Sequence, residues 1–155
     1  MKNLQLNQTE LLHRLQLYFP NIANIHLNRY YLAVTDFAVM RSDFFKYIIN
    51  YFNNINILFY FYDAKKDQFE IIKKFNISNI HDAKKVAHFY FHENINQNQF
   101  SYFYIIYDSN YKFIILSDDS LDFSLLLYNI NLVKKSFLKT ITDYFILLDE
   151  ITLGH

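Results

Sequence analysis

The chain has 155 residues, and its 15 basic and 15 acidic side chains cancel to a formal net charge of +0. This length is typical of one domain, so we expect residues 1–155 to form a single domain. The charge balance argues against a nucleic-acid binder that relies on bulk positive charge. The chain has no cysteine, which excludes disulfides, thiolate catalysis and cysteine zinc sites.

Glycine and proline are almost absent, with Gly154 and Pro20 as the single examples. The sequence therefore has no Gly-rich phosphate loop, dinucleotide fingerprint or glycine nucleophile elbow. The first residues lack the apolar stretch of a signal peptide, and no apolar run reaches the roughly 18–20 residues that span a bilayer. We therefore expect a cytoplasmic protein that has no membrane partner.

Apolar spacing predicts the elements, because helices bury every third or fourth residue and strands alternate. The helix that follows the candidate cap Asn7 ends at Pro20, and Ser78 or Asn79 caps a later helix. In chain order the sequence predicts a helix over 7–20, a strand over 26–34, a helix from Ser42-Asp43 or from near Asp36, a hairpin over 56–75 with its turn at 64–67, a helix over 81–92, a hairpin over 100–116 with its turn at 108–110, a strand over 122–129 and a helix from Asn131 to Leu148.

Two hairpins and the strand that follows them indicate a largely antiparallel sheet. The strand over 122–129 is nearly all apolar from Phe123, which is typical of a strand covered on both faces. The helices each have an apolar side that must pack on the sheet. The predicted fold class is α+β, with a largely antiparallel sheet of two hairpins plus extra strands packed against about four helices.

A histidine stripe is the sharpest chemical motif in the chain. His81, His88 and His92 are spaced by seven and four residues, so on a helix they share one side, and Glu93 follows them. Lys85 lies within the same stripe, where its ammonium group would repel a metal ion. The stripe lies opposite the apolar positions Ala83, Val86, Ala87 and Tyr90. We therefore interpret it as a solvated polar side and predict no metal site.

The acidic cluster Asp118, Asp119 and Asp122 lies between two predicted strands. Its spacing does not match a calcium loop, and no glycine bends the chain there, so a solvated turn is its ordinary interpretation. The glutamates are scattered, and no serine has a local signature of a catalytic triad. We predict no catalytic or cofactor site, and we do not expect an enzyme.

Exposed aromatic residues on hairpins are one feature of proteins that bind single-stranded nucleic acid, but such sites also require basic residues along the same groove. The strand FSYFYIIY has no basic residue, and Lys112 stands alone in its hairpin. The hairpin over 56–75 has four lysines, but they lie mostly at its turn and end. Nucleic acid is therefore not the expected partner.

The segment YFYIIYDSNYKFIILSDDSLDFSLLLYNINLVKKSFL resembles the layout of small bacterial immunity proteins from polymorphic-toxin and contact-dependent growth inhibition systems. The shared features are an aromatic strand ending in Asp, a short turn, an aromatic-aliphatic strand, an acidic loop, an apolar strand and a closing helix. Residues 100–129 carry the resemblance, and the closing helix extends it towards residue 150.

The resemblance implies an antitoxin that neutralises a cognate toxin, commonly a nuclease, by stoichiometric protein–protein contact and without a cofactor. An acidic loop flanked by tyrosines would suit a basic nuclease, because carboxylates steer association and tyrosines supply contact area. The expected contact residues are Asp118, Asp119, Asp122, Asp108, Tyr107 and Tyr111. The histidine and lysine stripe of residues 79–93 is the alternative binding side.

Two other functions stay open. One is a small phage or mobile-element module that binds host machinery or nucleic acid. The other is a metal-dependent enzyme that uses the histidine stripe. Chain-wide neutrality differs from the acidic balance of many nuclease inhibitors, which leaves the toxin class open as well.

Overall fold

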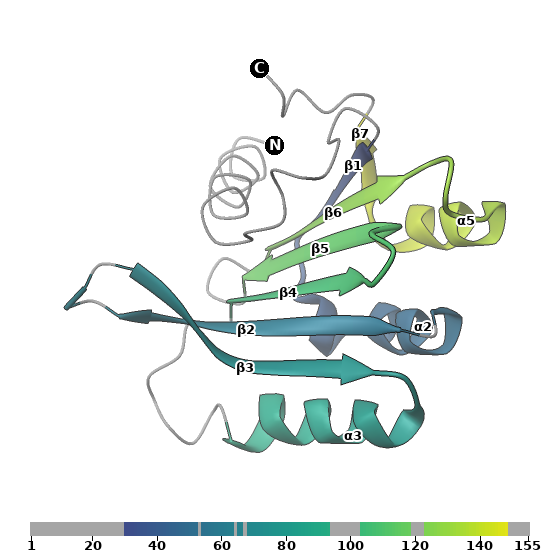
Figure 1. Ribbon diagram of the computed structural model, residues 1–155. Helices are drawn as coiled ribbons and strands as arrows, with labels where there is room; N and C mark the ends of the chain where they lie inside the picture. Colours follow the sequence, from purple (N-terminus) through teal and green to yellow (C-terminus); the bar gives the residue numbers. More distant parts are fainter. Residues whose placement is uncertain are drawn as a thin grey trace.

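The computed structural model describes residues 30–52, 54–63, 65–66, 68–93, 103–118 and 123–148. Within these ranges seven strands form one antiparallel sheet in the order β3-β2-β4-β5-β6-β1-β7 (Figure 1). The strands are β1 (Tyr30–Thr35), β2 (Ile55–Asp63), β3 (Gln68–Ile77), β4 (Phe103–Asp108), β5 (Phe113–Asp118), β6 (Phe123–Asn129) and β7 (Ile146–Leu148). The helical elements are the 3-10 turn η3 (Val39–Arg41), α2 (Asp43–Tyr51), α3 (Ile80–His88), its π-helical extension η4 (Phe89–Glu93) and α5 (Lys135–Tyr144).

This architecture confirms the predicted α+β class and the antiparallel sheet. Both predicted hairpins form, as β2–β3 and β4–β5. Three α-helices, rather than about four, lie in the described part of the chain. The predicted helix over 7–20 lies outside the described residues.

The N-terminal boundary of α2 is fixed by an extended residue. Ser42 has φ −111° and ψ 161°, so the helix begins at Asp43, as one of the two predicted starts has it. The alternative start near Asp36 is wrong, because residues 39–41 form a separate 3-10 turn. Asn79 is the cap of α3, and its side chain accepts a hydrogen bond from the Asp82 backbone N–H at 3.1 Å.

The predicted last helix, which was expected to continue to Leu148, is too long. The helix α5 ends at Tyr144, and residues 146–148 form β7, which pairs with β1. The segment keeps a helical spacing of apolar residues in the sequence, but the free edge of β1 offers backbone hydrogen bonds that a local pattern does not reveal.

Side chains of the strands alternate between two buried faces of the sheet. In β4, Phe103 and Ile105 lie in one apolar cluster, and Tyr104 and Ile106 lie in the other. The cluster with Tyr104 also contains residues of α2, α3 and α5, so these helices pack on that face. The buried residues of the second cluster all belong to strands. Burial on both faces explains the nearly continuous apolar runs of β4, β5 and β6.

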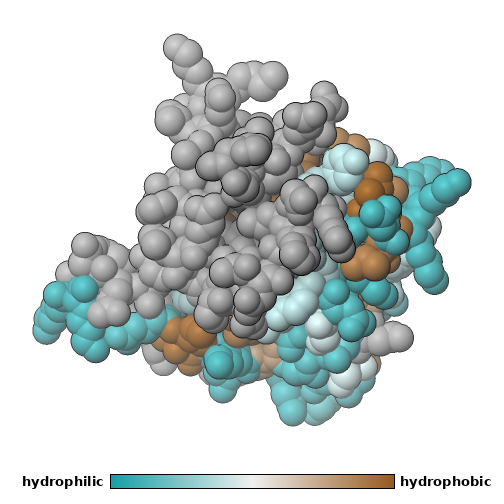
Figure 2. All heavy atoms as spheres, turned by 45° about the horizontal axis from the view of Figure 1, so that its top comes forward, coloured by the Kyte–Doolittle hydropathy of each residue, from teal (hydrophilic) through white to brown (hydrophobic). Residues whose placement is uncertain are grey.

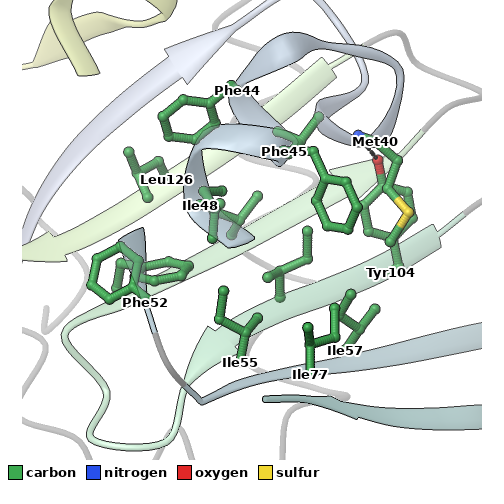
Figure 3. Close-up of a cluster of buried hydrophobic side chains, with 14 of the residues drawn as sticks. Met40, Phe44, Phe45, Ile48, Phe52, Ile55, Ile57, Ile77, Tyr104 and Leu126 are labelled. Carbon is green, nitrogen blue, oxygen red and sulfur yellow. Dashed lines mark hydrogen bonds between the residues drawn. The ribbon is translucent and has the colours of Figure 1, made fainter. Parts of the chain in front are cut away.

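The helix α2 contacts the centre of the sheet through Phe44, Phe45 and Ile48, all buried (Figure 3). Just before the helix, the backbone N–H of Met40 donates to the hydroxyl of Tyr104 at 2.9 Å in a buried setting. This bond satisfies a backbone donor at the chain segment that enters α2. A tyrosine hydroxyl inside the apolar cluster thus has a structural task.

The substitution Tyr104→Phe is expected to lower the free energy of unfolding by about 1–2 kcal/mol, because the buried Met40 N–H loses its acceptor. Urea unfolding measures this effect. The control is Tyr31→Phe, at a ring that is 37% exposed, and we expect a change within about 0.5 kcal/mol there. Equal effects of the two substitutions would contradict the assigned role of the Tyr104 hydroxyl.

Two buried serines provide a second polar contact between loop and sheet. Ser117 and Ser124 face each other across β5 and β6 with their Oγ atoms 2.7 Å apart. The Ser124 hydroxyl donates to the carbonyl oxygen of Phe37 at 2.7 Å. These hydroxyls therefore hold the turn that precedes η3.

Exposed apolar side chains occur at several separate places on the surface. Figure 2 shows hydrophobic residues at separate places on one face, beside hydrophilic ones. Among the described residues, the most exposed large apolar side chains are Ile80 (68%) and Ile146 (58%). Within the described ranges, no helix has the length and apolar character that crossing a membrane requires.

Candidate functional site

The acidic cluster predicted as a contact loop is only partly described. Asp118 is the last residue of β5, opposite Phe103 on one side and Phe123 on the other, and it is fully buried. Asp119 and Asp122 lie outside the described residues. A carboxylate inside the sheet does not reach the surface of a partner, so Asp118 is not retained as a contact residue.

Asp108 also has a structural position, at the turn between β4 and β5. It is 4% exposed, and its Oδ2 atom accepts hydrogen bonds from the backbone N–H groups of Asn110 at 3.2 Å and Lys112 at 3.3 Å. Its carbonyl oxygen accepts from the Tyr111 N–H at 2.8 Å. The residue therefore organises the turn from within, which suits Asp in a chain almost without glycine.

Tyr107 and Tyr111 stack on each other with ring centroids 5.6 Å apart and an interplanar angle of 6°. Tyr111 has a positive φ of 56°, a conformation that costs a non-glycine residue roughly 1 kcal/mol. The stack and a hydrogen bond from the Tyr30 hydroxyl to the Tyr111 carbonyl oxygen hold it there. Both rings are half-buried and pack against the second apolar cluster, so they contribute to the stability of the fold.

Several tyrosines of the sheet resist ionisation. Burial raises the pKa of Tyr30 to about 12, and the neighbouring Tyr111 and Asp108 add to the rise. Burial likewise raises the pKa values of Tyr60, Tyr107 and Tyr128 above the usual tyrosine range. Each of these phenols favours its neutral form in the folded protein.

Stability is expected to fall in alkaline solution, with the loss beginning near pH 10. A tyrosine whose pKa is higher in the folded state contributes in full to the free energy of unfolding at any pH below its unfolded-state pKa of about 10. This contribution is lost as the pH rises towards the folded-state pKa of about 12. Urea unfolding between pH 8 and about pH 11.5 measures the slope. Tyr30→Phe should make the slope shallower, and an unchanged slope would contradict the assignment.

The histidine stripe lies at the surface, with the side chains of His81, His88 and His92 all exposed. The rings of His88 and His92 have centroids 5.1 Å apart. Val86 and Tyr90, on the opposite side, are buried as predicted. Nothing is described of the Glu93 side chain. Within the described residues, no group of three His, Cys, Asp or Glu side chains is arranged to hold a metal ion.

A first groove lies between α2 and α3, with a volume of about 340 Å³. Its lining is almost entirely apolar, with Lys46 and Lys84 as its charged members. Ile80 and Phe91, at opposite ends of the α3–η4 segment, are 68% and 43% exposed and also contribute to it. The other lining residues are Met40, Ser42, Phe45, Ile49, Asn50, Ala83 and Ala87.

A second groove lies on the other side of α3, against the edge strand β3, with a volume of about 410 Å³. Figure 1 shows this arrangement, in which α3 lies beside β3 at one end of the sheet. The second groove is lined by two aromatic rings and five lysine or histidine side chains: Phe75, Phe89, Lys73, Lys84, Lys85, His81 and His88. The Lys73 ammonium group lies 5.5 Å from the centroid of the Phe75 ring.

The two grooves share Lys84 and together form one surface, which we call the α3 surface. The described charged residues that line it are cations, and no carboxylate is among them. The nearby Asp43 lies 3.9 Å from Lys46 in an exposed pair, which contributes little. Hydrogen bonds from Ser78 lower the pKa of Asp82, and the charges of Lys85 and His81 lower it further, so this carboxylate lies close to the second groove.

The α3 surface includes part of the histidine and lysine stripe, whose role as the alternative binding side stays a prediction, and most of its other residues were not predicted. Met40, Phe45 and Ile49 are about 40 positions from Ala87 in the chain, and only the fold brings them together. One signal was present in the sequence. Ile80 and Phe91 are large apolar residues of the helix that lie outside its predicted core stripe.

Comparisons with family models, with curated proteins and with solved structures found no match for this chain. Function is therefore inferred from the surface and from the sequence.

Proposed function

We propose that this protein is a stoichiometric protein-binding module, an immunity protein that neutralises a cognate toxin by direct contact. The observation that carries the proposal is the α3 surface, where apolar side chains such as Ile80 and Phe91 are exposed between cations. An apolar centre with a charged, solvated rim is typical of protein–protein interfaces. The immunity-like layout of residues 100–129 supports the same function.

The surface also bears on the class of toxin. A nuclease that binds phosphates has a basic active site, and the cations of the α3 surface would repel it. A nuclease target would therefore be contacted away from its phosphate-binding cleft. A toxin with an acidic surface fits the described residues equally well.

The direct test is co-expression with the product of the adjoining open reading frame. If the proposal is right, that product alone arrests growth, this protein restores growth, and the two proteins copurify. The matched control is the same toxin with an empty vector. Failure to restore growth and failure to copurify would together contradict the proposal.

Nucleic-acid binding is the second candidate, favoured by Lys73 near the Phe75 ring and by Lys84 and Lys85 in the same groove. Phosphate contacts would make the affinity fall steeply with salt, whereas apolar protein contacts would not. Fluorescence anisotropy with single-stranded DNA at two salt concentrations separates the candidates. Sub-micromolar binding that weakens by orders of magnitude in high salt would favour nucleic acid.

A further inference from the structure

We propose that the α3 surface is the docking site for an acidic, amphipathic segment of the partner protein. The inference rests on the proposed function, because it assigns the face that a neutralised toxin would contact. The expected partner segment has an apolar side that fills the first groove and carboxylates that contact the surrounding lysines.

The shape of the first groove carries the apolar half of the inference. Ala83 and Ala87 lie one helical turn apart on α3, and their small side chains leave room above the apolar residues of α2. The exposed side chains of Ile80 and Phe91 mark its two ends. These ends are eleven residues apart along the helix, or about 16 Å, which matches roughly three turns of a partner helix.

The lysines of the α3 surface are the reason to expect an acidic partner segment. Lys46 and Lys84 line the first groove, while Lys73 and Lys85 join Lys84 in the second. Carboxylates on a partner segment would meet cations along both sides of α3. Because these lysines are exposed, their main effects are on orientation and association rate, and the apolar contacts set the dissociation rate.

A nucleic acid or a lipid surface fits the same cations less well. The first groove has two lysines in a largely apolar lining, so it offers a nucleic-acid backbone few phosphate contacts. A lipid surface is met by a protruding apolar side, whereas these side chains line hollows. A protein segment satisfies both the hollow shape and the charge.

The test uses a synthetic acidic peptide as the probe. It carries leucine and phenylalanine at i, i+3, i+4 and i+7 spacing with glutamate elsewhere, and a scrambled peptide of the same composition is its control. Fluorescence anisotropy compares the wild-type chain with Lys84→Glu and Ala87→Trp. The matched control is Lys139→Glu, at an exposed lysine of α5 that lines neither groove.

We expect binding of the amphipathic peptide, the one that is not scrambled, to weaken about tenfold in Lys84→Glu. It should weaken more in Ala87→Trp, whose new side chain fills the groove. Lys139→Glu and the wild-type chain should agree within about twofold. Circular dichroism checks that each variant is folded, and Ala87→Ser, which leaves the groove open, should bind normally. Unchanged affinity in both groove variants would overturn the proposal. So would tighter binding of single-stranded DNA or of phosphatidylserine vesicles than of the peptide.

The same variants distinguish failure of this inference from failure of the proposed function. If the wild-type chain protects cells from the adjoining gene product and the double variant Lys84→Glu/Ala87→Trp protects equally well, the docking site is wrong and the function stands. If the peptide binds at the groove but the adjoining product is neither bound nor neutralised, the function is wrong and the docking site stands.

Discussion

Replacing Phe137 by alanine is expected to lower the free energy of unfolding by about 3–5 kcal/mol, the largest loss that we predict. The side chain is fully buried, and its ring centroid lies 5.1 Å from that of Phe52, 5.6 Å from Tyr51 and 5.8 Å from Phe113. Phe137 thus connects α5 to the end of α2 and to β5. Its removal leaves a cavity where three elements meet, and rigid neighbours close such a cavity only partly.

Urea unfolding of three variants separates this role from general damage to α5. Phe137→Leu keeps most of the volume and should cost clearly less than Phe137→Ala. Leu138→Ala, at the neighbouring half-buried residue, should also cost less. A loss for Phe137→Ala no larger than for Leu138→Ala would contradict the central position of the Phe137 ring.

Replacing Asp108 by alanine is expected to cost about 2–3 kcal/mol, because two backbone N–H groups lose a charged acceptor. Asp108→Asn retains one acceptor oxygen and should cost less. Both free energies come from urea unfolding at neutral pH. A loss below 0.5 kcal/mol for alanine, roughly the scatter of surface substitutions, would mean that the carboxylate does not hold the turn.

The Asp108 variants also test the contact role that the sequence suggested for this residue. If Asp108 acts within the turn, Asp108→Asn should associate with the partner at the wild-type rate while it remains folded. A slower association at low salt in a variant of normal stability would indicate that Asp108 contacts the partner.

The local pattern was sufficient to predict most of the sheet. Residues 103–118 alternate between two apolar clusters, and the turn around Asp108 uses a residue type suited to it, so the hairpin could be predicted without tertiary information. The capping residue Asn79 was recognisable for the same reason. These features depend on neighbours close in the chain.

Features that depend on distant partners could not be predicted. The strand β7 exists because β1 offers a free edge, and its three residues have no strand signature of their own. Asp118 resembles a loop residue in the sequence, yet strands on both sides pair with it and bury it. The α3 surface combines α2, α3 and β3, so its chemistry is invisible in any one segment.

We propose that the protein acts by stoichiometric contact, and a titration is the most direct test of this mode of action. The purified protein is added in steps to a fixed amount of the purified adjoining gene product, whose toxic activity is measured at each step. We expect a linear loss of activity that ends at an equimolar ratio, and a later end point for Lys84→Glu/Ala87→Trp. Complete loss of activity at a small fraction of that ratio, as a catalyst would produce, or no loss at any ratio, would contradict the proposal.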